Sequence, residues 1–127
     1  MQVLIVERQE YLAEVWSRHL QRMGADVVVG ADAERAIRAL NQHPIDILVI
    51  NLSLNEDSAL AVSDYAAYRR PEAKVIFVTS KTFFSDGSIF QHATNAVVML
   101  PQDTPPADLA AVVEHYAGAP SEGQGVD

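Results

Sequence analysis

The residues best suited to chemistry follow directly on short apolar runs of the chain. They are Glu7 and Arg8 after the first run, Asn51 after the third, and Thr79 and Ser80 after the fourth, whereas the fifth run ends in the apolar Leu100 and Pro101. A carboxylate, a guanidinium, an amide and two hydroxyls can hold a polar group by hydrogen bonds. Mg²⁺ prefers several hard, mostly anionic oxygens, and only Glu7 supplies one. The set predicts a polar pocket that is poor as a metal site.

Several other kinds of active site are excluded by composition and spacing. The chain has no cysteine, so disulfides, thiolate metal sites and thiol catalysis are impossible. Its histidines, His19, His43, His92 and His115, show neither HxH nor HxxxH spacing. GxGxxG, P-loop, GxSxG and HExxH motifs are also missing. We therefore predict no enzyme activity, no resident metal and no cofactor.

Composition limits the partners and the location. The 127 residues are 49% hydrophobic and 20% charged, and the formal net charge is −8. Nucleic-acid backbones and anionic membranes attract basic surfaces, so neither is expected as a direct partner. No stretch approaches the roughly 18 apolar residues that a membrane span requires. The first apolar run, 3–6, is too short for a signal peptide, which favours a cytoplasmic protein.

Five apolar, β-branched runs alternate with helical patterns. The runs are Val3–Val6, Val27–Val29, Ile45–Ile50, Val75–Val78 and Val97–Leu100. Continuous runs without polar alternation are typical of parallel strands buried on both faces. The helical patterns cover about 12–23, 33–43, 58–70, 86–94 and 105–116. Asp32 and Thr104 are the predicted N-caps of the second and fifth helices, and Gly24 is the predicted C-cap of the first.

This order predicts an α/β fold in which a (βα)₅ unit forms a doubly wound parallel sheet. The domain covers residues 1–117, and we expect residues 118–127 to be a disordered tail because they are rich in small and polar residues. In the flavodoxin-like strand order 2-1-3-4-5, the first and third strands are neighbours. Glu7, Arg8 and Asn51 then meet at the carboxyl ends of the strands, with Thr79 beside them.

The chain resembles the receiver (CheY-like) domain of bacterial two-component response regulators over residues 2–117. The resemblance is carried by VLIVER at 3–8, IDILVIN at 45–51, KVIFVTS at 74–80 and AVVMLP at 96–101. It implies a flavodoxin-like fold and a role in phosphorelay signalling. It further implies a pocket in which paired acids hold Mg²⁺, an aspartate accepts a phosphoryl group, and a hydroxyl and a lysine bind that group.

The resemblance places this chain's residues in a degenerate version of that pocket. Glu7 keeps the first acid, Arg8 reverses the charge of the second, and Asn51 replaces the phosphoacceptor. Thr79 keeps the hydroxyl, and Leu100 stands in place of the lysine before Pro101. The family favours a cis bond before this proline, whereas general frequencies favour trans, so the Leu100–Pro101 isomer stays open.

These departures remove the covalent chemistry. An amide is a very poor nucleophile, so Asn51 should not accept a phosphoryl group. With Glu7 and Arg8 both in the pocket, its charge sums to zero and no dication is needed. We hypothesise that Arg8 pairs with Glu7 or donates to Asn51, replacing Mg²⁺ permanently.

We therefore interpret the chain as a pseudo-receiver that signals by protein–protein interaction. Its partner is expected to be a kinase, an output domain, another regulator or a second copy, bound through the fourth helix, fifth strand and fifth helix. That face is represented by Phe83, Phe84, Phe90, Val112 and Tyr116. Two alternatives stay open. One is a small-molecule-sensing flavodoxin-like module that uses Asn51, Thr79 and Ser80; the other is a receiver with residual phosphoacceptor activity.

Overall fold

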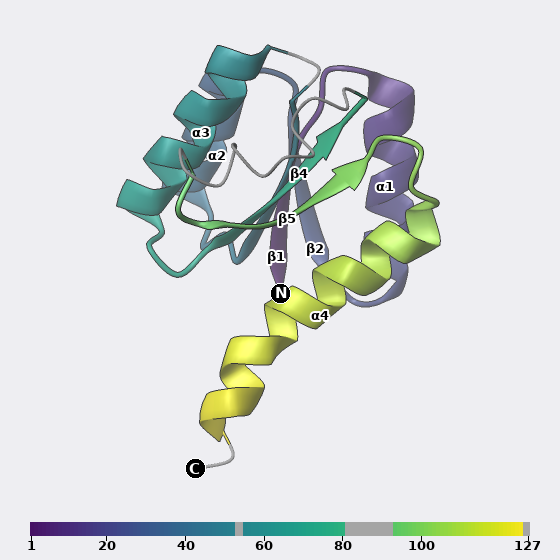
Figure 1. The fold of residues 1–127 in the computed structure, drawn as a ribbon, viewed down its shortest axis with the longest axis vertical. Helices are drawn as coiled ribbons and strands as arrows, with labels where there is room; N and C mark the ends of the chain where they lie inside the picture. The colour runs from purple at the N-terminus through teal and green to yellow at the C-terminus, as the bar shows by residue number, and fades with distance from the viewer. Residues whose placement is uncertain (53–54, 81–92, 126–127) are drawn as a thin grey trace.

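The computed structural model describes residues 1–52, 55–80 and 93–125 and contains one parallel sheet. Its strand order is β2-β1-β3-β4-β5, as predicted (Figure 1). The strands are β1 (Gln2–Val6), β2 (Asp26–Gly30), β3 (Ile47–Asn51), β4 (Lys74–Thr79) and β5 (Ala96–Pro101). The helices are α1 (Glu10–Arg22), α2 (Ala33–Gln42), α3 (Glu56–Arg69) and α4 (Pro106–Gly125). The flavodoxin-like architecture is confirmed.

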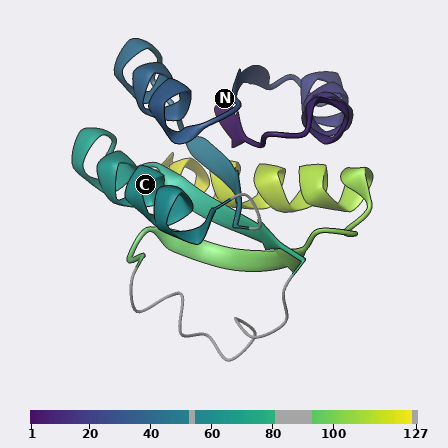
Figure 2. The same cartoon turned by 90° about the horizontal axis from the view of Figure 1, so that it is seen from above.

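Helices cover both faces of the sheet because the central strands are apolar on both sides. Figures 1 and 2 show α2 and α3 on one face, with α1 and α4 on the other. In β3, Leu48 and Ile50 pack toward α2 and α3, whereas Ile47 and Val49 pack toward α1 and α4. All four side chains are fully buried. This explains why the strands read as continuous apolar runs.

The register brings the carboxyl ends of the strands to one edge. Val6 lies opposite Gly30 on β2 and Ile50 on β3, and Thr79 lies opposite Pro101 on β5. Residues that follow these positions therefore meet at that edge, where ligands of open α/β sheets gather. The peptide bonds of the described residues are all trans, including Leu100–Pro101.

Helix α2 approaches the sheet very closely at Gly30. A Cβ atom at this position would lie 2.9 Å from both the Cα and the backbone nitrogen of Ala36. Only glycine lets the first turn of α2 pack directly on the end of β2. The predicted cap of this helix is confirmed, because Asp32 Oδ1 accepts a hydrogen bond of 2.8 Å from Arg35 N. Gly24, which follows α1, has a φ of +98°, as its C-cap role predicts.

The start of α4 differs from its prediction. Thr104 does not cap it; its hydroxyl donates instead to the carbonyl of Pro101 over 2.7 Å. The helix begins later, because the Pro105 carbonyl accepts its first i→i−4 hydrogen bond, from Leu109 N at 3.0 Å. Helix α3 also starts earlier than expected, capped by Asn55, whose Oδ1 accepts from Ser58 N over 2.9 Å.

The end of α4 also differs, since the helix runs to Gly125 and past the sheet (Figure 1), although a disordered tail was expected from Gly118. Pro120 has no N–H to donate to the Tyr116 carbonyl four residues earlier. Lys74 Nζ donates to that carbonyl over 3.2 Å and satisfies it. The helix predicted over 86–94 lies outside the described residues. Of the helices in the described ranges, none is long and apolar enough to cross a membrane.

Candidate functional site

Glu7 places a buried carboxylate at the carboxyl edge of the sheet. It follows the last residue of β1, and the residue is 3% exposed. Oε1 accepts a hydrogen bond of 2.5 Å from Asn51 Nδ2, and Oε2 accepts one of 2.9 Å from Gln9 N. Both oxygens of the carboxylate are therefore satisfied by protein N–H groups.

Asn51 ends β3, and its amide nitrogen joins two neighbours. It is 4% exposed, and Nδ2 donates to Glu7 Oε1 and, over 3.1 Å, to Gln102 Oε1. A carboxylate can only accept hydrogen bonds, so the amide must present its NH₂ group to Glu7. The two hydrogens of that group then serve two different acceptors. Asn51 therefore lies beside Glu7, as predicted.

Gln102 is a site residue that the sequence analysis missed. Its side chain accepts from Asn51, and its backbone N–H donates to the Thr79 carbonyl over 2.9 Å. It therefore ties the ends of β3, β4 and β5 together. The signal that could have found it was available, because Gln102 is also a polar residue just beyond an apolar strand. The predicted site residues of the fifth strand end one position earlier, at Pro101.

The placement predicted for Arg8 is wrong. Its side chain is exposed, and within the described ranges it forms neither an ion pair with Glu7 nor a hydrogen bond to Asn51. The Asn51 amide and the Gln9 N–H already occupy the Glu7 carboxylate. Burying the guanidinium would also cost several kcal/mol of desolvation. In the prediction, Arg8 cancels the charge of Glu7. In the structure, the Glu7 carboxylate instead accepts hydrogen bonds from neutral N–H groups.

The remaining predicted pocket residues are spread over the same edge. Thr79 is buried at the end of β4, whereas Ser80 is exposed. Leu100 is partly buried and packs on the core beneath α1 and α4, and Pro101 is exposed. Leu100 contributes an apolar side chain where the family pattern has a lysine.

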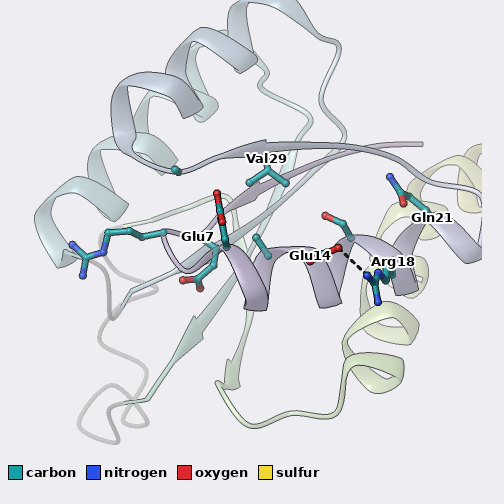
Figure 3. A pocket seen from close by; sticks show the side chains of 10 residues that line it. Glu7, Glu14, Arg18, Gln21 and Val29 are labelled. Carbon is teal, nitrogen blue, oxygen red and sulfur yellow. Dashed lines mark hydrogen bonds and ion pairs between the residues drawn. The ribbon is translucent and has the colours of Figure 1, made fainter.

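A cleft of about 450 Å³ lies between α1 and the end of β2 (Figure 3). Glu14 and Arg18 form an exposed ion pair of 2.8 Å along α1. The lining residues are Glu7, Arg8, Glu10, Ala13, Glu14, Ser17, Arg18, Gln21, Val29 and Ala31. Asn51, Thr79 and Ser80 are not among them, so this cleft is not the ligand pocket that the small-molecule alternative requires.

The donor set does not fit Mg²⁺. Such an ion needs hard oxygens around it, and the acid paired with Glu7 in the family pattern is replaced by the exposed Arg8. Asn51 turns N–H hydrogens, not an oxygen, toward Glu7. Across the described ranges no three His, Asp or Glu residues are grouped so that they could hold a metal ion.

Three of the five residues predicted for the partner face, Phe83, Phe84 and Phe90, lie outside the described residues. Val112 and Tyr116 are both on α4 and only partly buried. Both pack against the core formed with α1 and the sheet. These core contacts therefore contribute to the stability of the domain.

Comparisons with known proteins now identify the family. The model of the response regulator receiver domain matches residues 3–113, so the chain belongs to that family. It is a receiver domain of two-component signalling. A comparison with curated protein sequences finds no match.

Solved structures share this fold at low sequence identity. A CheY-like receiver domain protein from Methanospirillum hungatei JF-1 is 17% identical with a TM-score of 0.85, over 96% of this chain and 97% of that one. The receiver domain of a putative Luxo repressor from Vibrio parahaemolyticus is 18% identical with a TM-score of 0.84, over 99% and 96%. The regulator TrrA from Thermotoga maritima, in complex with Mg²⁺ and BeF, is 16% identical with a TM-score of 0.76, over 91% and 97%.

Proposed function

We propose that this chain is a pseudo-receiver, which accepts no phosphoryl group on residue 51 and signals through protein contacts alone. The observation that carries the proposal is the hydrogen bond of 2.5 Å from Asn51 Nδ2 to Glu7 Oε1. It joins the position of the phosphoacceptor to the position of a metal-binding acid. The amide supplies a permanent neutral donor where a phosphorylatable pocket holds a dication.

Three physical facts support this function. An amide nitrogen or oxygen does not attack a phosphoryl donor as a carboxylate does. The Glu7 carboxylate already has an N–H donor on each oxygen, so a metal would have to compete with them. Leu100 offers no charge to stabilise a transferring phosphoryl group. The domain does not turn over a substrate and works as a binding module.

The resting shape of the carboxyl edge is then fixed by hydrogen bonds. Gln102 links the β5 end to Asn51 and to the Thr79 carbonyl. A phosphorylatable receiver changes partner affinity through its covalent state, whereas this edge keeps one arrangement. Regulation then comes from the amount of the domain, or of a partner kinase, output domain or regulator, and not from phosphoryl transfer.

The test is incubation with acetyl phosphate and Mg²⁺, followed by intact-protein mass spectrometry. We expect no gain of a phosphoryl group by the natural chain. We also expect none by Asn51→Asp, because position 8 still supplies no acid for Mg²⁺ and Leu100 no positive charge for the phosphoryl group. A triple variant, Arg8→Asp with Asn51→Asp and Leu100→Lys, rebuilds the family pattern and is the positive control.

Calorimetry with Mg²⁺ completes the test. The natural chain should show no stoichiometric binding, and the triple variant should bind the ion. Phosphorylation of the natural chain would contradict the proposal, and robust labelling of the single Asn51→Asp variant would show that the amide is its sole obstacle.

A further inference from the structure

The chain carries a basic and aromatic surface at the end of the sheet opposite Asn51. Helix α3 ends at Arg69 and is followed by Arg70, and both residues lie beside the end of α2. In each βα unit the helix ends near the start of the next strand, so this surface is remote from the carboxyl edge. We define the Arg–Tyr surface as Tyr65, Tyr68, Arg69, Arg70 and Asn41.

Both guanidinium groups are held in place by α2. Arg69 Nε donates to Asn41 Oδ1 over 3.0 Å, and Arg70 Nε donates to the Leu40 carbonyl over 3.0 Å. Each bond uses only the Nε–H and leaves the two terminal nitrogens, whose parallel N–H groups match a carboxylate. Neither arginine forms an ion pair with any residue of the described ranges, whereas Arg38 on α2 pairs with Glu34.

The aromatic part of this surface is linked to α2 through the Tyr65 hydroxyl. The Tyr65 hydroxyl donates to Asn41 Oδ1 over 2.7 Å, so Asn41 holds both Tyr65 and Arg69. The Tyr68 ring packs against Tyr65 with centroids 5.9 Å apart, yet it is 78% exposed. Tyrosine and arginine dominate the energetics of protein interfaces, and side chains ordered beforehand lose less entropy on binding.

Charge selects the occupant. The chain has a net charge of −8, and the two arginines of the Arg–Tyr surface lie together with no ion pair to an acid within the described part of the chain. A polyanion such as RNA is repelled by the whole molecule in proportion to its charge. A short segment with few carboxylates is repelled only weakly. The acidic rest of the surface disfavours its binding elsewhere and so favours binding at the Arg–Tyr surface.

We propose that the Arg–Tyr surface binds a short acidic segment of a partner protein, with carboxylates on Arg69 and Arg70 and an adjacent aromatic side chain on Tyr68. The inference goes beyond the proposed function and does not depend on it. A phosphorylatable chain would carry the same surface, since none of its residues contacts Glu7, Asn51 or Gln102 through a hydrogen bond within the described ranges.

The test uses the full chain and a dye-labelled peptide, Glu-Asp-Trp-Asp-Glu, followed by fluorescence anisotropy. The double variant R69Q/R70Q should weaken binding by about tenfold, because charge-assisted hydrogen bonds to both carboxylates are lost. The control R18Q/R22Q makes the same change in net charge on α1 and should weaken binding by less than about twofold, through screened long-range attraction only.

Two further variants separate geometry from charge and from folding. R69K/R70K keeps the charge but loses the planar fork, and binding should fall by about threefold. Tyr68→Ala should also cost about threefold, because an exposed ring contributes contact area and little stability. Retention of the natural melting temperature by Tyr68→Ala keeps its result interpretable as a loss of contact.

Four results would overturn the proposal. They are equal weakening by R69Q/R70Q and R18Q/R22Q, equal binding of the neutral peptide Gln-Asn-Trp-Asn-Gln, tighter binding of a single-stranded RNA of similar length, and a dimer in sedimentation that R69Q/R70Q dissociates. The last would assign the surface to a second copy of the chain.

Discussion

The two ends of the sheet use asparagine in opposite ways. At the carboxyl edge, Asn51 is buried and donates to Glu7 and Gln102. At the other end, Asn41 is exposed and accepts from Tyr65 and Arg69. Each amide joins two side chains from other elements. Because water can replace only the exposed bonds, the same residue type should stabilise the fold at one end and order a surface at the other.

Substitution of each asparagine by leucine tests this comparison most strongly. Asn51→Leu leaves the buried Glu7 carboxylate with the Gln9 N–H as its one donor among the described residues, and should lower the free energy of unfolding by about 2–4 kcal/mol. Asn41→Leu, the matched control, should cost less than about 1 kcal/mol because water solvates its former partners. Urea denaturation measures both. Equal losses would show that burial does not distinguish the two sites.

Removal of the Gln102 side chain tests the same comparison for a single hydrogen bond. Gln102→Ala takes one acceptor from the buried Asn51 amide by removing a partly buried hydrogen bond, and should cost about 1 kcal/mol. Gln42→Ala, at the exposed end of α2, is the control and should change stability by less than about 0.5 kcal/mol. Thermal unfolding by circular dichroism gives both values. A neutral Gln102→Ala would mean that solvent already reaches this bond.

Asn55 allows the effect of burial on stability to be separated from the effect of position, because it lies at the carboxyl edge but is exposed. Asn55→Ala removes the N-cap of α3 and should cost about 1 kcal/mol, the usual value of a cap. Asp32→Ala, the equivalent cap of α2, should give a similar loss. Chemical denaturation distinguishes these variants from Asn51→Leu. An Asn55 loss as large as that of Asn51 would make position at the edge decisive instead of burial.

The smallest effect is expected on α1. Glu14→Gln breaks the ion pair with Arg18, whose side chains are 59% and 62% exposed. Exposed i,i+4 pairs contribute only about 0.3–0.5 kcal/mol, and added salt should remove the difference. Unfolding in low and high salt measures it. A loss near that of Asn51→Leu would indicate that the cleft between α1 and β2 strengthens the pair.

Sequence patterns determined most of the fold because its strands are apolar runs and the three central strands, β1, β3 and β4, are buried on both faces. The apolar runs around Val3, Val27, Ile47, Val75 and Val97 show no polar face at helical spacing, so they are not mistaken for amphipathic helices. Adjacency of β1 and β3 then placed Glu7 beside Asn51, as the hydrogen bond confirms. Helix ends were harder, because two consecutive prolines shift the start of α4 and Lys74 supports its extension.

The partners of individual side chains could not be predicted in the same way. Arg8 and Gln9 follow the same strand, yet the backbone of Gln9 and not the guanidinium of Arg8 reaches Glu7. Which one does so depends on the turn into α1, and no spacing rule encodes that turn. Gln102 illustrates the same limit, since its contact crosses from the end of β5 to β3.

The close approach at Gly30 makes α2 a mechanical connection between the two ends of the molecule. Its first turn rests on the backbone of β2 with no room for a methyl group, and its last turn holds both arginines. A rigid helix that packs this closely on a strand moves as a unit when the strand moves. A shift of α2 at the end of β2 would therefore reach Arg69 through the Asn41 side chain and Arg70 through the Leu40 carbonyl.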